Sequence, residues 1–165
     1  MLFRSKSFAA VLDPASVSSL LRAIDAYDGQ PTTRAALKLS ALFFQRPGNI
    51  RAMEWAWVDL DNAMLTIPPA NMKRTLHQKV NGRPHLVPLA DQAVEILKEL
   101  HLLTGHGRYV FPGARSFKRP MSGGTINAAL RRMDFDTDDH VAHGFRAMAR
   151  TMLAERMKGI DKDMV

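Results

Sequence analysis

The chain is 165 residues long, carries 23 Lys and Arg against 16 Asp and Glu, and contains no cysteine. This length suits one domain, and 46% apolar residues are enough for a buried core, which excludes a disordered basic tail. Without cysteine there is no disulfide framework and no thiolate metal site. No apolar run approaches the roughly 18 residues of a membrane span and the N-terminus lacks a signal-peptide pattern, so we expect a soluble, cytoplasmic protein.

The net charge of +7 is concentrated in two segments without any acidic residue. The first lies between Asp61 and Asp91 and contains Lys73, Arg74, Lys79 and Arg83. The second lies between Glu99 and Asp134 and contains Arg108, Arg115, Lys118, Arg119, Arg131 and Arg132. Subtracting these ten from the 23 basic residues leaves 13 against 16 acidic ones, so the rest of the chain stands at −3. Such clustering favours a polyanionic partner; a merely solvated Lys/Arg-rich surface is the alternative.

The predicted elements of the first third of the chain are helical. A first helix has Asp13 as its N-cap, followed by proline at the first helical position, and ends before Gly29. A second helix over about residues 32–45 must end near Arg46, because Pro47 disfavours helical geometry in the residue before it. Pro47 then begins a short third helix, whose expected buried face consists of Ile50, Met53 and Trp57.

The middle of the chain predicts a small sheet. A turn over residues 59–62 leads into a strand over 64–67, and the polar stretch 71–84 contains Asn81-Gly82, the strongest short hairpin signal, before a strand over 85–88. A helix stopped by Thr104-Gly105, a short strand-like piece over 109–111, and two further helices over 122–133 and about 143–157 follow, the last with Gly159 as its stop. The fold class is therefore mainly α with a small antiparallel β-sheet (α+β).

The last predicted helix carries the most informative cluster of polar residues. In His143-Gly144-Phe145-Arg146 the spacing of three places the imidazole and the guanidinium on one helix face, and Arg150 follows four residues later. This layout suits a phosphate, because guanidinium forks match phosphate oxygens and histidine exchanges protons near neutral pH. An ordinary amphipathic helix with solvated arginines and a capping histidine is the alternative.

His140 and His143 also form an H-x-x-H pair, the kind of pair that can bind a metal. The nearby Asp136 and Asp139 precede the predicted helix, where no regular spacing directs them at the imidazoles. We therefore expect no metal site and no cofactor.

Two further cations are candidates for contacting a ligand. Arg46 lies at a helix break, before a helix led by Pro47 whose free N–H groups attract an anion, although a cation at a helix C-terminus is also a common capping arrangement. Lys73 lies where the strand ends and the predicted hairpin begins, so it is either solvated or able to protonate a leaving oxygen.

Four motifs follow one another along the chain: Gln45 to Arg51, Trp55 to Asp61, Met72-Lys73 with His85 to Leu89, and His143 to Arg146. Their order resembles that of the catalytic domain of tyrosine recombinases of the phage integrase family, in particular prophage and genomic-island integrases. The resemblance implies a tyrosine-recombinase catalytic-domain fold. It also implies DNA integration or recombination, in which strands are cut and rejoined through a covalent phosphotyrosine and no nucleotide cofactor is needed.

The resemblance also implies roles for individual residues. Arg46 and Arg146 would bind the non-bridging oxygens of the scissile phosphate, Lys73 would protonate the departing 5′ oxygen, and His143 would assist proton transfer from the attacking tyrosine. Lys79 is an alternative for the lysine. The residues expected to contact the DNA backbone are Arg74, Lys79, Arg83, Lys118, Arg119 and Arg150.

The chain departs from the family pattern in three places. The tyrosine that should follow the H-x-x-R helix is not found before Val165, and we interpret Tyr27 and Tyr109 as packing residues. Asn49 stands where the family usually has an acidic residue that orients the Arg and Lys, and the segment from Lys73 to Arg83 makes a long hairpin.

These departures leave two main interpretations of the chain. As a single incomplete catalytic domain over residues 1–165, without an N-terminal DNA-binding domain and without the tyrosine segment, it would bind double-stranded DNA and be inactive in strand transfer. It would also self-associate, as the family forms tetramers on DNA. The alternative is a non-catalytic DNA-binding or regulatory module with a degenerate recombinase fold, and a helical small-anion-binding protein is a third possibility.

Overall fold

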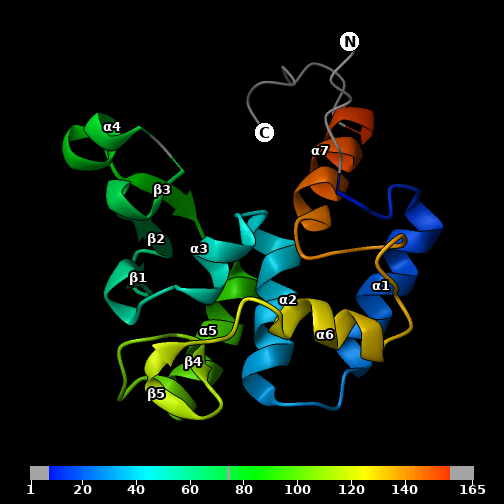
Figure 1. Cartoon of the computed structure of the whole chain (residues 1–165), viewed down its shortest axis with the longest axis horizontal. Helices are drawn as coiled ribbons and strands as arrows, with labels where there is room; N and C mark the ends of the chain where they lie inside the picture. The colour runs from blue at the N-terminus through cyan, green and yellow to red at the C-terminus, as the bar shows by residue number, and fades with distance from the viewer. Residues whose placement is uncertain (1–7, 74, 157–165) are drawn as a thin grey trace.

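The computed structural model describes residues 8–73 and 75–156 (Figure 1). Within these residues the helices are accompanied by two small antiparallel sheets, one of three strands in the order β1-β2-β3 and one formed by β4 and β5. The predicted fold class, mainly α with a small antiparallel sheet, is confirmed. None of the described helices is both long and apolar enough to span a membrane.

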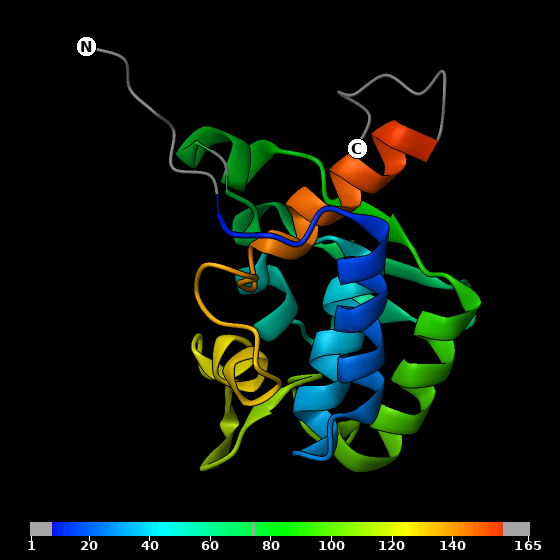
Figure 2. The same ribbon diagram turned by 90° about the vertical axis from the view of Figure 1, so that its right-hand side faces the viewer.

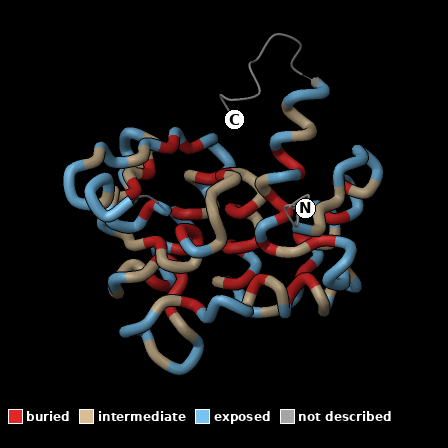
Figure 3. Tube along the Cα trace, turned by 45° about the horizontal axis from the view of Figure 1, so that its top comes forward, coloured by how far each residue is buried: buried red, intermediate tan, exposed pale blue. Residues whose placement is uncertain are grey.

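Helix α2 is the centre of the helical part. It runs over Pro31–Phe43 and packs against α1 (Pro14–Ala26), α5 (Asp91–Thr104) and α6 (Thr125–Arg132), and its residues Ala36, Leu37 and Leu39 are fully buried. Two views at right angles show α1, α2 and α5 running side by side (Figure 1, Figure 2). The tube coloured by burial shows the same core, with buried segments through the middle and exposed loops outside (Figure 3).

Single residues explain where α1 begins and where α2 ends. The Asp13 carboxylate accepts a hydrogen bond of 2.9 Å from the backbone N–H of Ser16, which confirms the predicted N-cap of α1. Helix α2 ends two residues before its predicted limit, because Phe44 adopts the left-handed conformation with φ 54°. This conformation reverses the chain direction before Arg46.

The third helix is shorter than predicted. Helix α3 covers only Pro47–Arg51, and Trp57 belongs to a separate 3₁₀ helix, η1 (Trp55–Trp57). Ile50, Met53 and Trp57 are all buried, so the expected core positions are confirmed although one helix does not carry them all.

The three-stranded sheet consists of β1 (Val58–Asp59), β2 (Met64–Ile67) and β3 (His85–Pro88). Leu65 of β2 pairs with Val58 on one side and Val87 on the other. Leu65, Ile67 and Val87 are buried, so one face of the sheet packs on the core and the other faces outward.

The predicted hairpin turn at Asn81-Gly82 is wrong. β2 and β3 do pair, but residues 68–84 between them form η2 (Pro69–Asn71) and helix α4 (Leu76–Asn81). Thr75 and Gln78 form a reciprocal capping box, each side chain binding the other's backbone N–H at 3.3 Å. The capping box starts a helix, and Asn81-Gly82 ends that helix instead of turning a hairpin.

The last part of the described chain contains a hairpin that the sequence did not predict. Strands β4 (Pro112–Gly113) and β5 (Ser116–Pro120) pair around a two-residue turn, while Tyr109 only bridges to Glu54. Helix α7 covers Gly144–Arg156 and begins one residue later than predicted; its predicted stop, Gly159, lies outside the described residues.

Candidate active site

The turn between α2 and α3 positions Arg46. Its φ of −61° and ψ of 142° are those of a helix N-cap, and its carbonyl oxygen accepts hydrogen bonds from the N–H groups of Asn49 at 2.8 Å and Ile50 at 3.1 Å. The backbone of Arg46 is therefore fixed by α3, and its half-buried side chain makes no hydrogen bond with any described residue. A guanidinium in this state is free to bind a ligand.

Arg146 reaches the same turn from the far end of the chain. It lies in the first turn of α7, and its Nη1 donates a hydrogen bond of 2.6 Å to the carbonyl oxygen of Phe44. Burial, and then the positive charge of Arg46, lower the pKa of Arg146 below its ordinary value. The electrostatic effect requires the two guanidinium groups to be close, although they are a hundred positions apart in the sequence.

His143 lies next to both arginines, immediately before α7. Partial burial lowers its pKa, and so do the charges of Arg46, Arg146 and Lys73, in that order of effect. A histidine with a pKa below its ordinary value is neutral at pH 7, so its free ring nitrogen can accept a proton. The structure thus brings together all four residues that the sequence predicted as catalytic.

Lys73 is positioned by the residue before it. Met72 is buried, and its Sδ accepts a hydrogen bond of 3.5 Å from Nδ2 of Asn49, which is also buried. The next residue, Lys73, is exposed. Asn49, at the position where the family usually has an acid, therefore links α3 to the segment that carries the lysine.

Lys79 lies in the last turn of α4 and is not among the charges that act on His143. Lys73, whose charge does lower the pKa of His143, is therefore grouped with the two arginines and the histidine. We name the set of Arg46, Lys73, His143 and Arg146 the cationic cluster.

No described carboxylate neutralises the cationic cluster. Over residues 8–73 and 75–156 the salt bridges are Lys38 with Asp25 and Arg108 with Glu54, and neither involves the cluster. Four basic side chains without an acidic partner form a site for an anion with several oxygens, such as a phosphate diester.

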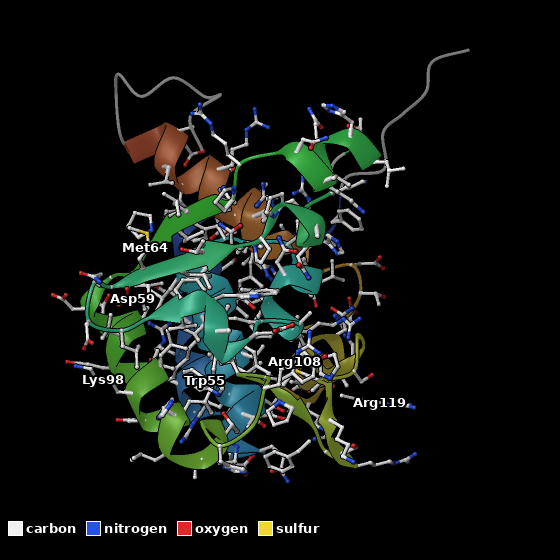
Figure 4. All side chains as sticks on the ribbon, turned by 90° about the vertical axis from the view of Figure 1, so that its left-hand side faces the viewer. Trp55, Asp59, Met64, Lys98, Arg108 and Arg119 are labelled. Atoms are coloured by element: carbon white, nitrogen blue, oxygen red, sulfur yellow. The ribbon has the colours of Figure 1, made fainter. Side chains whose placement is uncertain are left out.

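The residues predicted to contact the DNA backbone lie on several different elements. Arg150 is exposed on α7, one turn after Arg146. Lys118 and Arg119 are exposed on β5, and Arg119 extends outward from the hairpin (Figure 4). Arg83 is exposed after α4. Arg74 lies outside the described residues.

Some basic residues of the two acid-free segments serve the fold instead. Arg108 pairs with Glu54 at 2.7 Å. Arg131 donates from Nε to the carbonyl of Phe135 at 2.8 Å and from Nη2 to the carbonyl of His140 at 2.7 Å, which ties α6 to the loop before α7. The excess charge of these segments is therefore only partly available to a ligand.

Two residues near the cationic cluster were not predicted from the sequence. His140 is fully buried, and burial with the charge of Arg131 lowers its pKa to about 4. The ring of Phe8 stacks on that of His143, with centroids 4.2 Å apart. Phe8 gave no signal because it lies far from the motifs in sequence, whereas His140 was noted only as half of an H-x-x-H pair.

With the fold and the cationic cluster described, the sequence comparison identifies the family. The profile of the Phage integrase family matches residues 10–165, and the chain belongs to this family.

Curated relatives show how much of such a protein the chain represents. It is 38% identical over 145 residues to the putative protein IntB of Escherichia coli K12, which covers 84% of this chain and 37% of IntB. It is 37% identical over 141 residues to the integrase of Enterobacteria phage P4, covering 82% and 32% of the two chains. The chain therefore spans about a third of the length of these relatives.

Solved structures agree with the fold at lower sequence identity. XerA recombinase superposes with a TM-score of 0.65 at 18% identity, over 94% of this chain and 53% of that chain. A lambda integrase tetramer bound to a Holliday junction superposes with a TM-score of 0.64 at 18% identity, over 94% and 46%. These similarities confirm the tyrosine-recombinase catalytic-domain fold.

Proposed function

We propose that this chain is part of the catalytic domain of a tyrosine-type site-specific recombinase, and that its substrate is double-stranded DNA at an attachment site. The observation that carries the proposal is the convergence of Arg46, His143 and Arg146 with Lys73, four basic side chains without an acidic partner among the described residues. DNA is a polyanion that such a site would contact one phosphate at a time, and a DNA substrate agrees with the cytoplasmic location expected from the sequence.

The reaction assigns one task to each residue. Arg46 and Arg146 bind the non-bridging oxygens of the scissile phosphate and stabilise the charge that develops there in the transition state. A tyrosine oxygen attacks phosphorus and forms the phosphotyrosine bond, while the bond from phosphorus to the 5′ oxygen breaks. The tyrosine proton goes to His143, which is neutral at pH 7, and Lys73 gives a proton to the departing 5′ oxygen.

The described residues do not supply the nucleophile. Tyr27 is buried after α1, and Tyr109 lies under the guanidinium of Arg108, 5.3 Å from its ring centroid. On this proposal the chain binds DNA and holds the scissile phosphate, while the attacking tyrosine is not one of its 165 residues.

Duplex binding at low salt tests the proposal. Arg46→Ala and Arg146→Ala should each weaken the affinity for a short duplex at least tenfold, because each removes a charge-assisted phosphate contact worth about 1.5–3 kcal/mol. Arg22→Ala on the exposed face of α1 is the matched control and should leave the affinity nearly unchanged. Equal affinities for all four proteins would sink the proposal. A covalent adduct of the 165-residue chain with a nicked attachment-site duplex would overturn the part of it that places the attacking tyrosine elsewhere.

A second function, a non-catalytic DNA-binding or regulatory module, is favoured by one observation. Asn49 replaces the acid of the family and binds Met72 instead of a basic side chain. The reading frame downstream separates the two functions: a His or Trp followed by Tyr within roughly the next 60 residues supports the recombinase, and a stop codon after Val165 supports the module.

The proposal includes assembly on DNA. Lambda integrase is a tetramer on a Holliday junction, and the similar fold suggests that subunits of this protein also meet on DNA. Crosslinking with and without an attachment-site duplex tests this: complexes of more than one subunit should form only on the duplex, and monomers alone in both samples would exclude assembly.

A further inference from the structure

The segment before α1, residues 8–11, lies across the start of α7. The carbonyl oxygen of Ala9 accepts a hydrogen bond of 3.2 Å from the N–H of Val141, and the N–H of Val11 donates at 3.2 Å to Nδ1 of the buried His140. Figure 2 shows this segment, in blue, crossing the beginning of α7, in orange. We name residues 8–11 the N-terminal strap.

Gly144 allows the strap to approach this closely. A Cβ atom at Gly144 would lie 2.4 Å from the carbonyl oxygen of Ala9 and 3.2 Å from the Cα of Ala10, so any larger residue would displace the strap. Gly144 is itself buried and is the first residue of α7. The backbone of the strap and the start of α7 are therefore fitted to each other.

The strap places one aromatic ring on the cationic cluster. The Phe8 ring lies 4.2 Å from the His143 ring, with an angle of 15° between their planes, so the two rings are stacked face to face. Phe8 remains 57% exposed, which means that the hydrophobic core does not hold its ring. A large exposed apolar side chain that contacts a site residue calls for an explanation at that site.

We propose that Phe8 is a positioning residue, whose ring fixes the orientation of His143 in the cationic cluster. A histidine before the first turn of a helix is otherwise free to rotate about two side-chain torsions. The stacked ring covers one face of the imidazole and leaves its edge, which carries both nitrogens, accessible to a phosphate. This inference rests on the proposed function, because it needs the cluster to bind a phosphate.

The stacking is tested by proton NMR of the histidine rings in the 165-residue chain. A proton over the face of an aromatic ring is shielded, so Phe8→Leu should shift the His143 ring protons downfield and leave His106 unchanged. Phe117→Leu is the matched control, because Phe117 is 50% exposed and stacks on His106 at 5.2 Å. It should shift His106 and leave His143 unchanged.

The positioning role is tested by titration with inorganic phosphate, followed on the His143 resonances. Phe8→Leu should weaken the apparent affinity about 3- to 10-fold, the loss expected for one aromatic pair, and Phe8→Tyr should restore it. Gly144→Ala, which displaces the strap without changing either ring, should produce the same loss. Phe117→Leu should not affect the affinity.

The outcomes separate this inference from the proposed function. Unchanged His143 resonances in Phe8→Leu would overturn the stacking, and shifted resonances with unchanged phosphate affinity would overturn the positioning role. Arg46→Ala is the reference for the site itself. If Arg46→Ala weakens phosphate binding and Phe8→Leu does not, only the inference fails; if neither has an effect, the proposed function fails as well.

Discussion

Arg146 Nη1 and the carbonyl oxygen of Phe44 form a hydrogen bond of 2.6 Å between residues 102 positions apart. The bond joins the first turn of α7 to the left-handed turn that precedes Arg46. Arg146 therefore has a structural contact in addition to its proposed role as a phosphate ligand.

Replacing Arg146 should reveal both roles. Arg146→Ala should lower the free energy of unfolding by about 1–2 kcal/mol, because it leaves the half-buried Phe44 carbonyl without its partner. Arg150→Ala, four residues further along the exposed side of α7, should weaken duplex binding without changing stability. Chemical denaturation of the two variants measures the difference, and equal stabilities would show that the Phe44 contact contributes nothing.

The choice between Lys73 and Lys79 can be made without measuring catalysis. The charge of Lys73 contributes to the low pKa of His143, so Lys73→Ala should raise that pKa towards its ordinary value. Lys79→Ala should leave it unchanged, since Lys79 does not act on His143. Titration of the His143 ring by NMR gives both values, and a rise in Lys79→Ala alone would reassign the lysine.

The stability of the fold should decrease in mild acid because of His140. Its pKa is about 4 in the folded chain and near 6.5 in an unfolded one, so the unfolded state binds more protons between these values. The stability contributed by neutral His140 is complete above about pH 6.5 and is lost as the pH falls towards 4, by up to about 3 kcal/mol. Denaturation at a series of pH values should show that the free energy of unfolding depends less on pH in His140→Gln than in the original chain. The same pH dependence in both proteins would contradict this.

A double-mutant cycle on protein stability should detect the contact between Asn49 and Met72. Met72→Leu keeps the apolar volume but leaves the buried Asn49 amide without its acceptor, which should cost about 1 kcal/mol. Met64→Leu on β2 (Figure 4) is the control, since Met64 is a strand methionine whose side chain has no described hydrogen bond. In Asn49→Ala the further change Met72→Leu should cost less than it does in the original chain. Additive effects would mean that the two side chains do not interact.

The exposed cations of β5 should act through charge alone. Lys118→Ala and Arg119→Ala should each reduce the slope of log affinity against log salt by about 1, as expected for one lost phosphate contact. Lys98→Ala on α5 is the control and should leave the slope unchanged; Figure 4 shows Lys98 well separated from Arg119. Fluorescence anisotropy with a labelled duplex at several salt concentrations measures the slopes. If the slopes of Lys118→Ala and Arg119→Ala equal that of Lys98→Ala, β5 does not belong to the DNA-binding surface.

Most of the helices could be predicted because their signals are local. Asp13 with the following proline, and Pro47, mark helix starts that depend only on neighbouring residues. The prediction was wrong at Asn81-Gly82, where two local signals competed and the capping box of Thr75 and Gln78 determined the structure. The β4–β5 hairpin was missed because its strands are too short to show a period.

The cationic cluster could be predicted only through the order of its motifs. Nothing in the spacing of Arg46 and Arg146 indicates that they meet, because their proximity depends on how α7 packs against α2. The contact of Phe8 with His143 and that of Met72 with Asn49 also depend on tertiary packing and carry no sequence signal. Local chemistry thus identifies the residues, and tertiary structure determines their partners.

Helix α7 projects from the body of the molecule, and its later residues Thr151 to Glu155 are half-buried or exposed (Figure 1, Figure 3). Its first turn carries Arg146, while Arg46 belongs to the opposite side of the site. A phosphate bound by both arginines would link α7 to α3 noncovalently. DNA binding should therefore slow the opening of α7 from the core, so that the substrate completes the packing of the helix that binds it.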